Sequence, residues 1–225
     1  MVRKRSLKRD EKGAIGIEIL IVFIAIVLVA AVSAAVLIQT VGFLQQKAMA
    51  TGRQTTQEVA SGIKVVKVLG HVDSPRTANG KVDLLAIYVE VNTGGQEIDL
   101  NATKITLYDG SKTVTFKQNT AAFTDGTAGI SNTFDTTQKA WANLTSSTDF
   151  GIIVLQDEDG SITSGTYPVI NAGDKVILTV NVTAAFSGWS PRTSVSGEVR
   201  PEFGAPGIIE FTTPAAYTEN VVELQ

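Results

Sequence analysis

Residues 19–38 read ILIVFIAIVLVAAVSAAVLI, and this run sets the character of the N-terminal part of the chain. Its twenty residues include one polar side chain, Ser33. At about 1.5 Å of rise per residue, a helix over this run is roughly 30 Å long, which matches the hydrocarbon core of a bilayer. The run therefore predicts a helix that can span a membrane.

A basic leader precedes the apolar run. Residues 1–12 hold two acidic and six basic residues, the latter being Arg3, Lys4, Arg5, Lys8, Arg9 and Lys12. Positive charge next to a membrane helix favours the cytoplasmic side, so we expect the rest of the chain to lie outside the cell. A plausible cleavage site, Lys12-Gly13-Ala14, lies before the apolar run rather than after it, as in a class III (prepilin-like) signal peptide of residues 1–13. An uncleaved signal anchor is the alternative.

The composition excludes several classes of protein. The 225 residues contain no cysteine and one histidine, His71, so neither a disulfide scaffold nor a histidine metal cluster is available. A Ser/His/Asp hydrolase would depend on that single residue, which we interpret as a surface or packing histidine. The formal charge of −3 argues against a nucleic-acid partner. Since the common catalytic and phosphate-binding motifs are also missing from the sequence, we expect no enzyme, no cofactor and no metal.

Helical periodicity continues beyond the apolar run. Apolar or small residues recur at roughly three- to four-residue steps, namely Leu44, Ala48, Thr55, Val59 and Ile63. Gly62 is the expected C-terminal cap, because glycine accepts the left-handed conformation. The helix is predicted to cover residues 14–62, on the order of 70 Å, which is longer than a bilayer requires. Its excess length must pack against something else.

Several helix residues are candidates for contacts between subunits. Small residues four positions apart let neighbouring helices approach closely, and this helix has two such pairs, Ala30 with Ala34 and Ala31 with Ala35. Large apolar residues, Phe23 among them, make up the remainder of the apolar run. A helix that is apolar all round needs either lipid or other helices around it. Glu18 is the fifth residue after the proposed cut. It either interacts with the helix dipole alone or pairs with the new amino terminus, Ala14, of a neighbouring subunit.

The remainder, residues 63–225, is predicted to form an antiparallel β-sandwich or barrel of the immunoglobulin-like kind, which makes the fold class α+β. Turn-forming residues separate eight β-branched runs, at 63–69, 82–91, 103–109, 112–117, 150–156, 175–182, 193–200 and 207–213. Asp109-Gly110 indicates a hairpin between two of them. Residues 119–148 are rich in Thr, Ser, Asn and Gly, and we expect a long exposed loop or insertion there.

Two kinds of surface site follow from short motifs. Asn101, Asn143 and Asn181 each begin an Asn-x-Thr triplet, the acceptor motif for N-glycosylation, and Asn143 is expected to be the most accessible. The carboxylates of Asp157–Gly160 look like part of a calcium loop but lack its full spacing and its terminal glutamate, so we favour a solvated turn between strands over a cation site.

Residues 13–65 strongly resemble the N-terminal region of archaeal flagellins (archaellins), through the pattern LIVFIAIVLVAAV followed by VLIQT and GFLQQKAMATGR. The resemblance implies a structural subunit of the archaeal flagellum (archaellum), the filament used for swimming. It also implies a membrane-inserted precursor, a prepilin-type peptidase, a membrane assembly platform with its ATPase, an oligosaccharyltransferase that glycosylates the chain, and a homopolymer or a co-polymer with other archaellins.

Two other functions remain open from the sequence. Glu18 is a feature of type IV pilins and favours a type IV-like adhesion pilin, whereas GFLQQKAMATGR favours the archaellin. A membrane-anchored ectodomain that never polymerises is the third reading, because the leader and helix alone are compatible with it.

Overall fold

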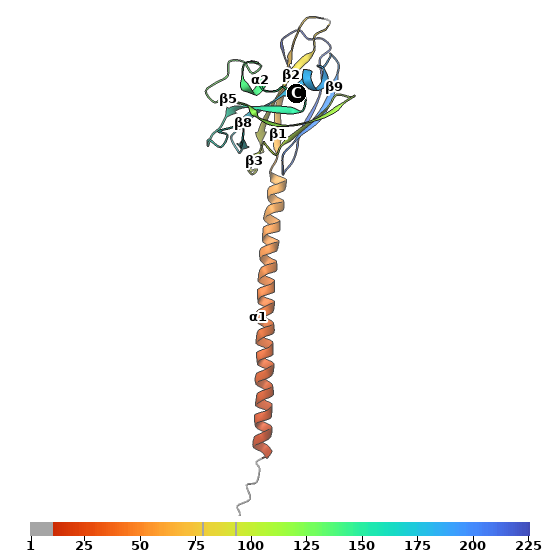
Figure 1. Ribbon diagram of the computed structural model, residues 1–225. Coiled ribbons are helices and arrows are strands. Elements are labelled where there is room, and N and C mark those ends of the chain that lie inside the picture. The colour runs from red at the N-terminus through yellow and green to blue at the C-terminus, as the bar shows by residue number, and fades with distance from the viewer. Residues whose placement is uncertain (1–10, 78, 93) are drawn as a thin grey trace, which may run out of the picture. The chain divides into compact units, whose positions relative to one another are not determined.

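The computed structural model describes residues 11–77, 79–92 and 94–225, and Figure 1 shows its elements. The chain divides into two compact units, with the division after Gln54. Helix α1, Glu11–Ala60, provides the described part of the first unit and enters the second. Its sequence contains no proline, and it combines the strong helix formers Ala and Leu with apolar Ile and Val. Apart from Gly42, which is half-buried, every described residue from Ile15 to Gln54 is exposed.

The helix ends two residues before the expected cap. Ala60 is its last residue, and Gly62 does not adopt the left-handed conformation of a cap but forms a parallel β-bridge with Ala205, so the prediction of a glycine cap at Gly62 is wrong. A Cβ atom on Gly62 would lie 2.7 Å from the Ala205 carbonyl oxygen, so close backbone approach explains the glycine. Ser61 is fully buried beside it, and its hydroxyl accepts a hydrogen bond of 2.8 Å from the Gln96 amide.

The second unit is built on one nine-stranded sheet with the order β10-β9-β4-β5-β6-β8-β2-β1-β11. All eight predicted runs are strands, and the pairing is antiparallel except between β5 and β6, which confirms a mostly antiparallel β domain behind a long apolar helix. A separate pair, β3-β7, adds a two-stranded sheet. The strands are β1 Ile63–Val72, β2 Val82–Val91, β3 Ile98–Asp99, β4 Lys104–Tyr108, β5 Thr113–Asp125, β6 Asp149–Gln156, β7 Val169–Ile170, β8 Lys175–Asn181, β9 Ser194–Arg200, β10 Gly207–Thr212 and β11 Val221–Glu223.

The sheet curls until its two ends meet, so it is a barrel-like layer rather than two separate sheets. The side chain of Gln225, just after β11, accepts from the Glu210 amide at 2.9 Å and donates to the Ile208 carbonyl at 3.3 Å. The backbone carbonyl of Gln225 accepts from the Val68 amide on β1. One residue therefore joins β1 to β10. The curled sheet encloses a core of apolar side chains that includes Leu85, Ile87 and Trp189.

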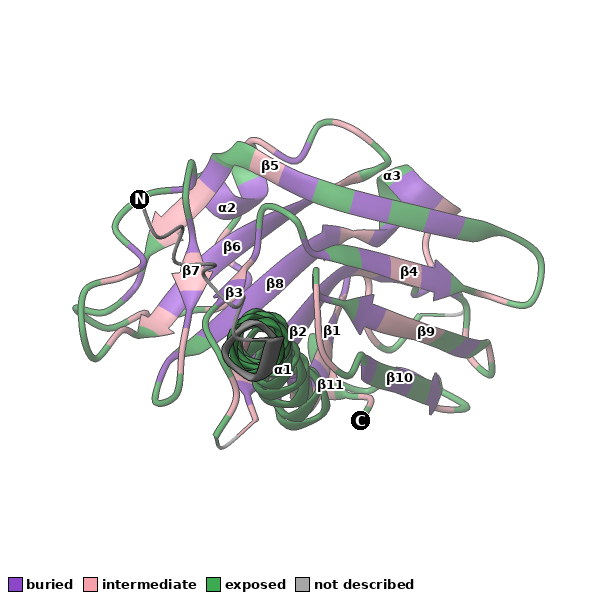
Figure 2. Ribbon diagram, turned by 90° about the horizontal axis from the view of Figure 1, so that it is seen from below, coloured by how far each residue is buried: buried purple, intermediate pink, exposed green. Residues whose placement is uncertain are grey.

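The predicted hairpin is present between β4 and β5. Gly110 has a φ of 89°, which glycine adopts without strain, and the Asp109 amide donates to the Lys112 carbonyl. Side chains alternate between buried and more exposed along β4 and along residues 113–118 of β5, as the banding of these strands shows in Figure 2. This period of two places one face on the core and the other in solvent.

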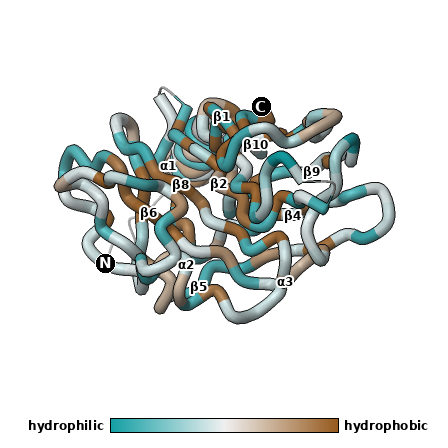
Figure 3. The backbone as a smooth tube through the Cα atoms, turned by 90° about the horizontal axis from the view of Figure 1, so that it is seen from above, coloured by the Kyte–Doolittle hydropathy of each residue, from teal (hydrophilic) through white to brown (hydrophobic). Residues whose placement is uncertain are grey.

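Residues 126–148 differ from the expected exposed loop. β5 continues to Asp125, and the segment after it carries the short helix α2, Lys139–Ala142. Its buried side chains, Phe134, Trp141 and Leu144 among them, form a second apolar cluster with Leu84 and Ala86 of β2. Alternate residues of β2 face the two clusters, so that strand is buried on both faces. Figure 3 shows that hydrophobic residues run through the middle of the β domain.

Candidate assembly helix and surface sites

Helix α1 displays its apolar side chains on every face. Phe23 is 65% exposed, and Ala30, Ala31, Ala34 and Ala35 are exposed as well. Within the described residues, α1 is the helix that is long and apolar enough to cross a membrane. Exposed apolar surface of this extent is unfavourable in water, since each Å² left exposed forgoes roughly 25 cal/mol of stabilisation. The helix is therefore built to be surrounded by lipid or by other helices.

The residues around the proposed cleavage site lie at the start of this helix. Lys12, Gly13 and Ala14 fall within the first turn of α1, and their side chains, like residues 1–10, lie outside the described part of the chain. Glu18 is one turn further along and is exposed. Its carboxylate is therefore on the helix surface, where a group from outside the chain can reach it.

The three glycosylation motifs lie in different surroundings. Asn101 is exposed in the turn between β3 and β4, and the hydroxyl of Thr103, its motif threonine, donates to the Asp99 carbonyl. Asn143 is half-buried, and its side-chain nitrogen Nδ2 donates to the Ala121 carbonyl at 2.6 Å. Asn101 is thus more accessible than Asn143, and the expected order of these two is wrong because residues 126–148 fold back onto β5.

The side chain of Asn181 forms hydrogen bonds that compete with N-glycosylation. It precedes the short helix α3, Val182–Phe186, and its side-chain oxygen accepts from the Ala184 amide at 3.0 Å. Its nitrogen donates to the Leu144 carbonyl at 3.4 Å. An Asn that caps a helix stabilises the first turn, so a glycan on this nitrogen would have to break a packed contact.

The acidic turn after β6 contains a group of three carboxylates. Oxygens of Asp157, Asp159 and Asp174 lie within 4.8 Å of one another. Asp174 comes from the turn between β7 and β8, which the sequence motif did not include, whereas Glu158 is not part of the group. Hard cations such as Ca²⁺ prefer oxygen ligands of this kind.

Backbone hydrogen bonds already account for these carboxylates. Asp157 accepts from the amides of Gly160, Ser161 and Ile162, and Asp174 accepts from the amides of Glu158 and Asn171. Such bonds fix a tight turn without any ion. The arrangement can hold a cation, and it is also complete as a turn.

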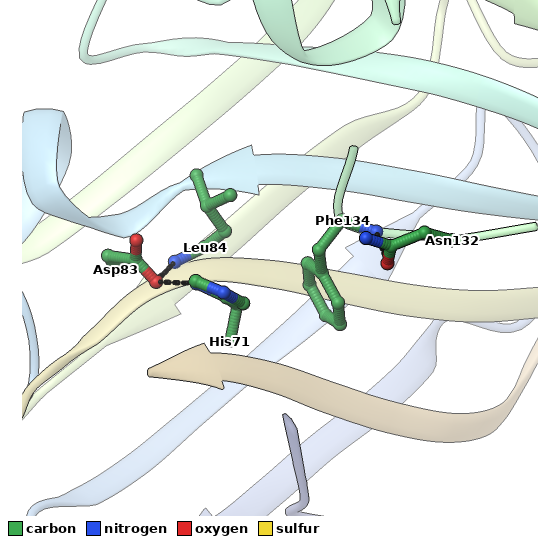
Figure 4. Close-up of polar contacts among 5 residues, drawn as sticks. All are labelled: His71, Asp83, Leu84, Asn132 and Phe134. Carbon is green, nitrogen blue, oxygen red and sulfur yellow. Dashed lines mark hydrogen bonds and ion pairs between the residues drawn. The ribbon is translucent and has the colours of Figure 1, made fainter. Parts of the chain in front are cut away.

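His71 has a packing role, as expected. Its Nδ1 atom lies 2.7 Å from Oδ1 of Asp83, and the same oxygen accepts from the Leu84 amide at 2.9 Å. Its ring packs at 5.5 Å between centroids against Phe134, whose amide is held by the side chain of Asn132 (Figure 4). The histidine therefore helps to hold residues 126–148 against the sheet.

Comparison with known proteins agrees with the geometry. The family model for archaeal-type flagellin matches residues 13–211. Flagellin B2 of Methanocaldococcus jannaschii is 54% identical over 219 residues, which cover 96% of this chain and 97% of that protein. Flagellin B1 of Thermococcus kodakarensis is 42% identical over an alignment that covers 96% of this chain and 99% of that one.

Solved structures show the same fold. The crystal structure of archaeal flagellin FlaB1 from Methanocaldococcus jannaschii superposes with a TM-score of 0.66 at 40% identity, and the match covers 74% of this chain and 98% of that one. The archaeal flagellum of Methanospirillum hungatei superposes with a TM-score of 0.59 at 20% identity over 92% of this chain and 98% of that one. With its apolar helix, its curled β domain and these matches over most of its length, the chain belongs to the archaeal-type flagellin family.

Proposed function

We propose that this chain is a non-enzymatic structural subunit that polymerises into the archaeal flagellum filament and so serves swimming motility. The observation that carries the proposal is α1, a helix of 50 residues whose described apolar side chains are exposed on every face. Other copies of the same helix can bury that surface as completely as lipid does. Membership of the flagellin family favours this function over the adhesion pilin that Glu18 left open.

The subunit would first be a membrane-inserted precursor. A prepilin-type peptidase would cut it between Gly13 and Ala14, which removes the basic leader and creates a cationic amino terminus. Glu18 of one subunit would then pair with Ala14 of a neighbour, because a carboxylate enclosed among apolar helices is unfavourable without a positive partner. A membrane platform and its ATPase would supply the energy for assembly.

The finished filament would lie outside the cell with the β domains toward solvent. An oligosaccharyltransferase would attach glycans there, and the exposed turn at Asn101 is the best acceptor, with Asn143 and Asn181 less accessible. Polar glycans on an outer surface add solubility without entering the apolar core.

Mass spectrometry of material sheared from cells tests the proposal. The mature subunit should be released as filaments with a first residue of Ala14, and a strain lacking the gene should lose swimming. A chain that keeps its leader and stays in the membrane fraction would support the anchored ectodomain and overturn the proposal. A deletion strain that swims normally but no longer attaches to surfaces would instead favour the adhesion pilin.

Replacing Gly13 by a bulky residue checks the cleavage site separately. The variant precursor should accumulate uncut in the membrane, since the peptidase would meet a large side chain at the scissile position. Normal filaments from this variant would contradict the assigned site while leaving the polymer itself untouched.

A further inference from the structure

Three cations form a row across the outer face of the sheet. Lys104 on β4 lies directly opposite Lys117 on β5 and, on its other side, directly opposite Arg200 on β9. All three residues are exposed. The next residues along these strands, Ile105, Phe116 and Val199, are buried in the core, so the three cations point away from it.

Such a row works against the stability of the isolated sheet. Residues directly opposite on neighbouring strands have Cβ atoms about 4.5–5.5 Å apart, and like charges at that separation repel. Among the described residues, Arg200 pairs with Glu198, whereas neither Lys104 nor Lys117 has a carboxylate within 4.0 Å. Asp149 lies beside Lys117 on β6, but its side chain accepts from Asn119 instead.

An acidic groove lies elsewhere on the β domain. Its volume is ≈ 610 Å³, and its lining includes two exposed carboxylates, Glu97 and Asp159, and no basic residue; the other lining residues are Gly95, Gln96, Asn171 and Ala172. Hydrogen bonding from Ser161, whose backbone amide donates to Oδ1 of Asp159 at 2.9 Å, lowers the pKa of the Asp159 carboxyl.

The two surfaces are on different parts of the same domain. The groove lies among the turns beside β3 and β7, and the row crosses β4, β5 and β9. Figure 2 shows β3 and β7 on one side of the domain and β4 and β9 on the other. A chain that polymerises into an open helical filament contacts its neighbours through heterologous interfaces, in which two different patches of one chain meet. Two separated patches of opposite charge meet that requirement.

We propose that the row of Lys104, Lys117 and Arg200 on one subunit docks on the groove of Glu97 and Asp159 on a neighbouring copy of this chain. The inference rests on the proposed function, since it assigns a contact in the outer layer of the polymer. The partner copy neutralises Lys104 and Lys117, which the isolated domain leaves without a carboxylate, and adds to the pairing that Arg200 already has with Glu198. Electrostatic matching of this kind fixes register and excludes wrong neighbours.

Charge reversal tests the contact. Lys104→Glu places a carboxylate between two cations, which favours the isolated sheet, so a failure of this variant to assemble cannot be ascribed to a less stable fold. Filament yield, measured as sheared chain relative to total chain in the cell, should fall about tenfold, because one unfavourable contact repeats at every subunit. Glu97→Lys should have a similar effect. Lys139→Glu, at an exposed lysine of α2 outside the row, is the matched control and should stay within about twofold of the parent.

The double variant with both Lys104→Glu and Glu97→Lys decides the matter. It restores opposite charges across the contact, so its yield should return to within about twofold of the parent. Parental yield from either single variant, or a double variant no better than the poorer single one, would overturn the proposed contact. The latter result would point to another anionic partner for the row. In both cases the parental filaments themselves still support the proposed function, which fails separately if the parent chain forms none.

Discussion

Replacing Trp141 by alanine should loosen residues 126–148 from the sheet while leaving the enclosed core intact. The indole is 5% exposed, packs against Phe134 at 5.6 Å between ring centroids, and donates from Nε1 to the Thr133 carbonyl at 2.7 Å. Removing a buried aromatic side chain costs about 3–5 kcal/mol. Trp141→Phe keeps most of the volume and loses the hydrogen bond, so it should cost about 1–3 kcal/mol.

Hydrogen exchange followed by mass spectrometry on purified filaments measures where that stability is lost. Amides of 126–148 should exchange roughly two to three and a half orders of magnitude faster in Trp141→Ala, since every 1.4 kcal/mol is a factor of ten. Amides of β4 and β9 should keep their protection. Tyr167→Ala removes an aromatic ring that is 73% exposed and is the control, with an expected change within about 0.5 kcal/mol. Equal loss of protection in every strand would refute the idea that the second cluster is a separate cooperative unit.

Three further predictions concern single positions. Gly204 has a φ of 93°, and a Cβ atom there would lie 2.4 Å from the Ser61 carbonyl oxygen. Gly204→Ala should therefore lower the thermal unfolding midpoint of the chain, and an unchanged midpoint in calorimetry would contradict the close approach. The Thr127 amide and hydroxyl lower the pKa of Asp125, so the stability from this carboxylate is complete above its unfolded pKa of about 3.9 and is lost as the pH falls through its lower folded pKa. Asp125→Asn should therefore reduce stability at pH 7 and flatten its dependence on pH below about 4, and parallel acid-unfolding curves would argue otherwise. Finally, Asn101→Gln should remove a glycan from the sheared subunit, as a mass decrease in the tryptic peptide, and an unchanged peptide mass would show that this turn is not modified.

Local sequence was sufficient for the long helix and the eight main strands, but not for the short elements β3, β7, β11, α2 and α3. The apolar run at residues 19–38 predicts a helix because its length matches one bilayer, and helix periodicity carries it to within two residues of its end at Ala60. β-branched runs with turn residues between them predict the eight main strands, and Asp109-Gly110 predicts the hairpin, because a tight turn depends on a few adjacent residues. The family resemblance rests on the same N-terminal residues.

Contacts between distant residues were beyond the sequence. Glycine at position 62 looks like a helix cap, and only the approach of Ala205, far along the chain, shows why it is glycine. Residues 126–148 look like an exposed loop because their polar residues outnumber the few buried ones that anchor them.

The candidate sites also divide into those that the sequence predicts and those that only the tertiary structure brings together. The leader, the helix and the glycosylation motifs are short contiguous patterns, so the sequence alone is enough to predict them. Asp174 joins Asp157 and Asp159, and Lys104 joins Lys117 and Arg200, only when strand order and register are known. Register depends on which strands pair and in which direction, and a shift of one residue would move every side chain to the opposite face, so the tertiary structure alone determines which charges meet.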